Sequence, residues 1–211
     1  MKRYLSRPAL SIAAVITLAA CGADAETAAP VGDPTASTPA ATTTTAEPST
    51  DVSEEHNDAD VMFAQMMIPH HQQAVEMSEI ILAKENINPE VTELATQIKD
   101  AQGPEIETMT GWLEAWGEPV GGMESHDMGS MGGGMDGMMS EDQMAGLEAA
   151  EGEEAARMFL EFMTEHHNGA VDMAQEEIDD GENPEAIALA ETIVETQQAE
   201  IQEMEELLAE L

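Results

Sequence analysis

The chain has 211 residues and carries 44 acidic against 6 basic side chains, a formal net charge of −38 at pH 7. A field of this sign repels nucleic acids and anionic lipids, so the composition argues against a nucleic-acid partner. The single cysteine, Cys21, excludes an intramolecular disulfide and a site built from several thiolates.

Residues 1–20 have the pattern of a targeting segment. Three basic residues precede a short apolar run over residues 9–20, which is too brief for a mature transmembrane helix. Residues 18–22 (Leu-Ala-Ala-Cys-Gly) resemble the lipobox of bacterial lipoproteins. We therefore expect a lipoprotein signal peptide, with cleavage before Cys21 and a lipid on its thiol that anchors the protein on the outer face of the cell membrane. An ordinary secretory peptide is the alternative.

Residues 21–57 consist mainly of Ala, Thr, Pro, Ser and acidic residues, a composition that predicts a disordered tether. A flexible segment of this length has a root-mean-square reach of roughly 30–36 Å, enough to hold a domain clear of the lipid surface. Residues 58–211 are then expected to form one compact domain.

The most informative motif is a histidine pair, His70-His71, which recurs 96 residues later as His166-His167. In both copies one methionine lies three residues before the pair, and another lies seven residues after its first histidine. Imidazole and thioether suit copper and other soft or borderline metals. The predicted metal ligands are Met67, His70, His71, Met77, Met163, His166, His167 and Met173.

Helical periodicity begins near residue 58 and predicts helices over about 58–85, 89–116, 141–180 and 184–211. Asn88-Pro89 and Asn183-Pro184 are expected to open the second and fourth helices, because Asn caps a helix and Pro fits its first turn. Two hairpins that are each apolar along one face bury those faces best against each other. The sequence therefore predicts an all-α fold, a four-helix bundle built from two repeated helical hairpins.

The second helix of each hairpin also repeats, at an offset of 95 residues. Gln102 and Glu105 correspond to Gln197 and Glu200. A buried amide left without a hydrogen bond costs about 1–3 kcal/mol. These four side chains could hydrogen-bond to metal-bound histidines, and the two glutamines could equally set the register of the core.

Two readings compete with metal binding at the histidine pairs. A methionine stripe at helical spacing is usually core packing, and an interior histidine is usually a hydrogen-bonded core residue. A carboxylate-bridged di-iron site, by contrast, requires Glu-x-x-His, and no Glu lies three residues before any of the four histidines. This absence counts against a ferritin-like metal-dependent oxidase, and no enzymatic activity is expected.

Between the hairpins, residues 117–143 form a Gly- and Met-rich loop. Thioether sulfur binds Cu(I) or Ag(I), so the loop is a candidate secondary metal-binding segment. A plain linker and a set of oxidation-scavenging methionines are the alternatives. The candidate ligands in the loop are Met123, His126, Met128, Met131, Met135, Met138 and Met139.

The pattern Met-x-x-His-His-x-x-Ala-Val-x-Met, present twice behind a lipobox-like sequence, resembles the DUF305 family of bacterial envelope proteins over about residues 56–211. The resemblance implies a ferritin-like four-helix bundle and, for some Met/His-rich members, copper binding in the periplasm. It carries over to the eight Met and His residues of the two motifs and to nothing in the Gly/Met-rich loop.

The function expected from these observations is an extracytoplasmic, lipid-anchored protein that binds copper, as Cu(I) or Cu(II), for sequestration or transfer without catalysis. Binding of another transition metal is a further possibility. The first alternative is an envelope protein-interaction module with structural histidine pairs, and the second is the ferritin-like oxidase. The expected partners are a metal ion and the membrane through Cys21, while an envelope protein partner or a homodimer is left open.

Overall fold

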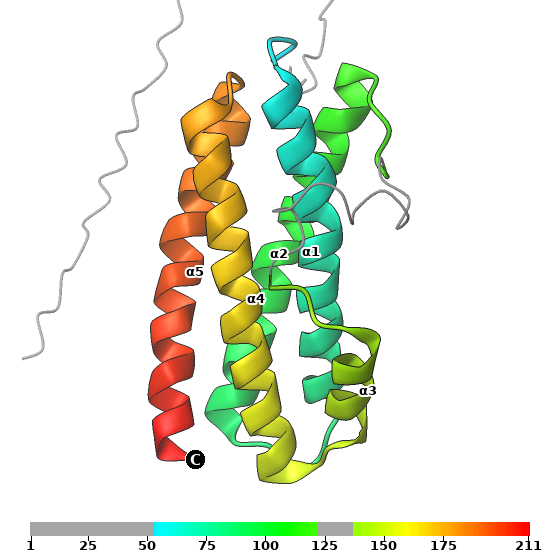
Figure 1. Ribbon diagram of the computed structural model, residues 1–211. Helices are drawn as coiled ribbons and strands as arrows, with labels where there is room; N and C mark the ends of the chain where they lie inside the picture. The colour runs from blue at the N-terminus through cyan, green and yellow to red at the C-terminus, as the bar shows by residue number, and fades with distance from the viewer. Residues whose placement is uncertain (1–52, 122–136) are drawn as a thin grey trace, which may run out of the picture. The chain divides into compact units, whose positions relative to one another are not determined.

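The computed structural model describes residues 53–121 and 137–211, and within these ranges the chain is all-helical, as predicted. The four long helices lie side by side, and a short helix packs against the outer side of two of them (Figure 1). No helix in the described ranges is long and apolar enough to cross a membrane. The elements are α1 (Asp58–Leu82), α2 (Pro89–Trp116), α3 (Glu141–Ala149), α4 (Gly152–Asp180) and α5 (Pro184–Glu210).

The starts of the helices follow from local sequence. Asn57 caps α1 in a capping box, in which its side chain accepts from the backbone N–H of Asp60 and the Asp60 carboxylate accepts from the backbone N–H of Asn57. Asn88 and Asn183 cap α2 and α5, each followed by a proline in the first turn. The predicted starts of these two helices are therefore confirmed.

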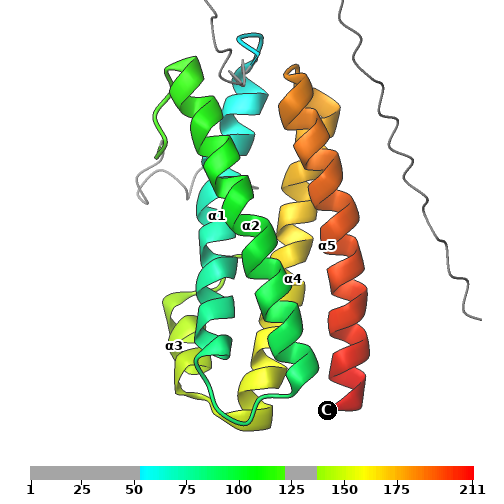
Figure 2. The same ribbon diagram turned by 180° about the vertical axis from the view of Figure 1, so that it is seen from behind.

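The long helices form two hairpins, α1–α2 and α4–α5, and the hairpins meet mainly through α1 and α4. These two helices run in opposite directions, as the chain colouring in Figures 1 and 2 shows. The repeated sequence halves are thus repeated structural halves.

The predicted third helix over 141–180 is wrong in one respect, because it is two helices. Ala150 has extended backbone and ends α3, and α4 begins at Gly152. Helix α3 lies outside the two hairpins, and at the offset of 96 residues nearly all of the positions equivalent to it lie outside the described residues. It packs on α1 and α4 through Leu147, which is fully buried. The predicted 117–143 loop therefore ends three residues early, because Ser140 caps α3.

The apolar core is divided into two parts by a layer of polar side chains. On α1, Phe63 to Ile68 belong to one apolar cluster and Ala74 to Ile81 to the other, with His70 and His71 between them. On α4, His166 and His167 separate the same two clusters. We call this level of the bundle the histidine layer; its buried polar members are His70, His71, Gln102, His166, His167 and Gln197.

The structure also describes the last five residues of the predicted tether. Residues 53–57 pack against one end of the bundle, where Trp116 donates a hydrogen bond to the Ser53 carbonyl and Asn183 donates one to the Glu55 carbonyl. The packed part of the chain therefore begins at least as early as residue 53. The predicted signal peptide, Cys21 and the rest of the tether lie outside the described residues.

Candidate metal site

His70 and His166 meet at the centre of the histidine layer, with ring centroids 3.7 Å apart and ring planes tilted by 42°. They are equivalent residues of the two hairpins. Such a contact between equivalent residues of the antiparallel helices α1 and α4 (Figure 1) is what a twofold relation between the two hairpins would give.

The second histidine of each pair bonds a carboxylate of its own hairpin. His71 Nε2 lies 2.7 Å from Glu105 Oε2, and His167 Nε2 lies 2.8 Å from Glu200 Oε2. Both imidazoles are fully buried, whereas the Glu105 and Glu200 side chains are 18% and 12% exposed. The predicted association of these glutamates with the histidines is therefore present, and it is the same in both halves.

These hydrogen bonds define how the two imidazoles can act. A neutral imidazole that donates Nε2–H to a carboxylate keeps the lone pair on Nδ1. Nδ1 of His71 and Nδ1 of His167 accept no hydrogen bond from any described residue. A carboxylate behind the imidazole also raises its basicity, as it does for metal-bound histidines. Nδ1 is therefore the atom of each ring that could bind an ion.

The environment favours the neutral form of the two imidazoles of α4. Burial, followed by the neighbouring imidazoles of His70, His167 and His71, lowers the pKa of His166 well below its usual range. Burial also lowers the pKa of His167, although the hydrogen bond to Glu200 acts in the opposite direction. Neutral imidazole is the form that binds metal ions.

The four predicted methionine ligands are buried. In the sequence each motif holds two of them, but in the structure each apolar cluster takes one methionine from each motif. Met67 of α1 shares an apolar cluster with Met173 of α4, on one side of the histidine layer. Met77 of α1 shares the other cluster with Met163 of α4. Each side of the layer thus combines one thioether from each hairpin, because α1 and α4 are antiparallel.

Gln102 and Gln197 are buried in the same layer, at 2% and 3% exposure. Neither amide atom of Gln102 is hydrogen-bonded within the described ranges, and neither is Oε1 of Gln197. The structure therefore brings both glutamines to the histidines but shows no bond by which Gln102 orients them.

The donor set fits a soft ion better than a hard one. Across residues 53–121 and 137–211, no group of three or more His, Asp or Glu side chains is arranged to hold a metal ion. What the layer offers is neutral imidazole with thioether above and below it, and these ligands favour Cu(I) over ions that prefer oxygen.

A segment of the predicted metal loop packs beside this layer. The side-chain amide of Gln73 exchanges two hydrogen bonds with the backbone of Met139, at 2.9 Å and 2.7 Å. Gly137 lies so close to α4 that an added Cβ would be 2.7 Å from the Glu165 carbonyl oxygen. Met139 is itself buried in the core, and its role as a metal ligand stays a prediction. Sequence analysis did not identify Gln73, whose counterpart in the repeat is Gly169.

Two candidate ligands of the loop, Met138 and Met139, lie within the described residues. The predicted ligands outside the described residues are Met123, His126, Met128, Met131 and Met135.

Comparison with solved structures gives relatives over most of the bundle. A DUF305 protein of Streptomyces coelicolor, whose structure is named as that of a secreted protein, is 40% identical, with a TM-score of 0.66, and the match covers 72% of this chain and 93% of that one. A DUF305 fragment from Deinococcus radiodurans is 36% identical, with a TM-score of 0.65, over 74% and 98% of the two chains.

The chain is also similar to CopM, whose structure in a Cu(I)-bound form matches with 33% identity and a TM-score of 0.60, over 72% of this chain and 96% of CopM. CopM structures in Cu(II)-bound, Ag-bound and apo forms match as well. Comparison with curated proteins gave no match. The model of the family described as "Domain of unknown function (DUF305)" matches residues 60–208. The chain therefore belongs to the DUF305 family.

Proposed function

We propose that this protein binds copper outside the cytoplasm and sequesters or transfers it without catalysis, while a lipid on Cys21 holds it at the cell membrane. We further propose that its bundle is of the ferritin-like four-helix type. The similarity to CopM, which has been crystallised with Cu(I), Cu(II) and Ag, supports the choice of metal. The names of the relatives, one of them secreted, support the location.

The observation that carries the proposal is the repeated imidazole–carboxylate pair in a buried layer. His71 and His167 each place Nε2 on a glutamate and keep Nδ1 without a hydrogen-bond donor in the described part of the chain. Leaving two buried polar atoms unsatisfied costs free energy. A bound soft ion would recover that cost.

Thioethers complete the proposed ligand set. Met67 and Met173 belong to the apolar cluster on one side of the layer, and Met77 and Met163 belong to the cluster on the other side. The ion would then be held between the hairpins, because every such set takes donors from both α1 and α4. The protein would supply neutral nitrogen and sulfur ligands and would exclude water from the ion. The only negative charges beside the histidines would be those of Glu105 and Glu200.

Two matched methionine variants test the proposal. In one, Met67 and Met173 are replaced by Leu; in the other, Met109 and Met204 are replaced by Leu. All four residues are buried, and in both variants the volume change is small, with an expected cost below about 1.5 kcal/mol for each exchange. Only the first pair belongs to the proposed site.

Affinity of the full chain for Cu(I) and for Ag(I) would be measured by competition with a chromophoric chelator. The M67L/M173L variant should bind more than about tenfold more weakly, which is about 1.4 kcal/mol, whereas M109L/M204L should bind like the wild type. Equal affinities for all three proteins would contradict ligation of the ion by Met67 and Met173.

One observation favours a second candidate, a module for protein interaction in the envelope whose histidine pairs are structural. The two imidazole–glutamate pairs already satisfy one nitrogen of each ring, and no group of three or more carboxylate or imidazole side chains in the described ranges forms a ready metal site. Replacement of His71 and His167 by Gln separates the two functions. A fall in melting temperature with unchanged copper affinity would support the module.

A further inference from the structure

Two carboxyl groups are buried together at the end of the bundle that carries the N-terminal segment. Asp60 of α1 is 0% exposed and Glu177 of α4 is 2% exposed. Their carboxyl groups lie close together, because Asp60 accepts from the backbone N–H groups of Glu182 and Asn183 and the Glu177 carboxyl lies against Gly181. The copper proposal uses neither residue. Charged side chains are almost never fully buried unless they are paired with an opposite charge.

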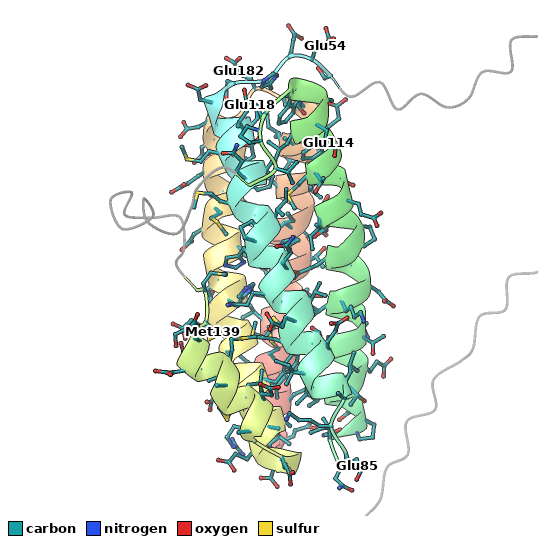
Figure 3. The ribbon with its side chains drawn as sticks, turned by 90° about the vertical axis from the view of Figure 1, so that its right-hand side faces the viewer. Glu54, Glu85, Glu114, Glu118, Met139 and Glu182 are labelled. Carbon is teal, nitrogen blue, oxygen red and sulfur yellow. The ribbon has the colours of Figure 1, made fainter. Side chains whose placement is uncertain are left out.

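No basic residue neutralises this pair. The three basic side chains in the described ranges make their contacts elsewhere: Lys84 with the carbonyls of Glu148 and Ala150, Lys99 with Glu79, and Arg157 with Glu153. The charged groups nearest in the chain are all acidic, namely Asp58 on α1, Asp179 and Asp180 at the end of α4, and Glu182 and Glu185 around the start of α5. Figure 3 shows Glu54, Glu114, Glu118 and Glu182 at this same end, opposite Glu85.

The two carboxyl groups have different surroundings. Asp60 accepts hydrogen bonds from the backbone N–H groups of Asn57, Glu182 and Asn183, at 2.6 to 3.3 Å. Three such donors stabilise a carboxylate. Glu177, by contrast, has no donor for either oxygen among the described residues. Two ionised carboxyls would also have no hydrogen atom to share, so a hydrogen bond between them requires a proton on one, and the surroundings place it on Glu177.

The repeat provides an internal comparison. The residues equivalent to Asp60 and Glu177 are Ala156 and Ile81, and both are buried in the apolar cluster at the opposite end of the bundle. The fold thus accepts an apolar pair at this position. Gly181 supports the polar pair, because any added Cβ there would overlap the Glu177 carboxyl group.

We propose that Asp60 and Glu177 form a proton-binding site that fastens residues 53–57 to the bundle. A proton on Glu177 is donated in a hydrogen bond to the ionised Asp60 carboxylate. Asp60 in turn holds the backbone of Asn183. The side chain of Asn183 donates to the carbonyls of Ser53 and Glu55. The loss of this proton places two negative charges side by side in a region without cations.

The segment fastened in this way is the one that joins the bundle to the rest of the N-terminal chain. Ser53 also accepts a hydrogen bond from the Trp116 indole at 3.0 Å, and His56 stacks on the same indole at 4.5 Å. Detachment of residues 53–57 would therefore expose Trp116, which gives the site an optical readout.

Burial, followed by the interactions with Asp60, raises the pKa of Glu177 to about 9. Burial acts to raise the pKa of Asp60, but the hydrogen bonds from Glu177 and from three backbone N–H groups outweigh it and lower that pKa. A carboxyl whose pKa is raised on folding stabilises the fold fully below its unfolded value, here 4.5, and this contribution is lost as the pH rises through the folded value.

The variant Glu177→Gln tests the proposal, with Glu176→Gln as its matched control. The amide donates to Asp60 without any ionisable proton, and Glu176 is an exposed neighbour that undergoes the same Glu-to-Gln exchange outside the carboxyl pair. Melting temperatures of the full-length chain would be measured from pH 7 to pH 9, above the range in which the histidines of the layer titrate, together with tryptophan fluorescence. Over this range wild type and E176Q should lose stability as the pH rises, and E177Q should not. At pH 8, E177Q should melt about 2–4 °C higher than wild type.

A parallel slope in E177Q and wild type would overturn the proposal. So would stabilisation of the wild type, but not of E177Q, by Mg²⁺ or Ca²⁺ at pH 8, because the site would then bind a cation. A measurement that needs no variant is the ¹³C NMR titration of the Glu177 carboxyl carbon in the full-length chain. The proposal expects this carbon to be protonated at pH 7, and an ordinary acidic titration would overturn it.

Discussion

Gln73 and Gly169 occupy equivalent positions in the two hairpins, and they fix the same segment from opposite sides. Gln73 bonds the backbone of Met139, whereas Gly169 has no side chain and so allows Gly137 to approach α4. Each lies three residues after a histidine of the central contact, His70 or His166. Residues 137–140 therefore cross the α1–α4 face near the level of the histidine layer.

Replacement of Gln73 by Ala should loosen this segment. Two hydrogen bonds to the Met139 backbone are lost, so the free energy of unfolding should fall by about 1–2 kcal/mol, and the Met139 amide should exchange faster with solvent. Urea unfolding and hydrogen exchange measure the two effects. The control is Gln72→Ala, which alters an exposed neighbour; equal effects for both variants would show that the Gln73 contacts do not stabilise the segment.

Two glycine substitutions should change stability in opposite directions. Gly137 has φ +87°, and its added Cβ would lie 2.7 Å from the Glu165 carbonyl oxygen. Gly137→Ala should therefore destabilise by more than about 1 kcal/mol. Gly111 lies within α2 and an added Cβ would meet nothing within 4 Å, so Gly111→Ala should stabilise by about 0.5–1 kcal/mol. Thermal unfolding measures both, and a shift of the same sign in both would be inconsistent with this geometry.

Glu105 and Glu200, the hydrogen-bond partners of His71 and His167, should contribute equally to the free energy of unfolding. Glu105→Ala and Glu200→Ala each leave a buried imidazole Nε2 without its acceptor, at a cost of about 1–3 kcal/mol. Exposed Glu107 provides the control, Glu107→Ala, for which we expect almost no change. In the wild type, ¹⁵N NMR should find the proton on Nε2 of His71 and His167. A proton on Nδ1 instead would contradict the ligand assignment.

The histidine layer should make the metal-free protein sensitive to acid. The pKa values of His166 and His167 are lowered on folding, so the unfolded chain takes up protons first as the pH falls below about 6.5. Stability that is present above this pH is lost below it, by at most about 1.4 kcal/mol per histidine and pH unit. His166→Gln should flatten the fall in melting temperature between pH 7 and pH 5. An unchanged slope in this variant would mean that His166 does not carry the effect.

The repeat made most of the fold predictable. It identified both hairpins, the caps at Asn88 and Asn183, and the association of Glu105 and Glu200 with the histidine pairs. The repeat did not predict how one hairpin is oriented relative to the other. A helical stripe shows that Met67 and His70 share a face, but only the antiparallel packing of α1 on α4 brings Met67 beside Met173.

The features that sequence reasoning missed are those at which the two halves differ. Asp60 corresponds to Ala156, Glu177 to Ile81, and Gln73 to Gly169. At each of these positions one copy has a polar residue, and the other copy has an apolar residue or glycine. The environments of the two equivalent positions therefore differ. A residue-by-residue comparison of the copies would have selected these positions, although not their contacts. Helix α3 could not be predicted from the repeat, because it lies in the insertion between the copies.

The contact of His70 with its own equivalent shows what the single chain permits. Two identical hairpins could form the same layer as a homodimer, but the two ends of that dimer would be identical. Because both hairpins belong to one chain here, the ends can differ, and one holds the carboxyl pair of Asp60 and Glu177 where the other holds Ala156 and Ile81.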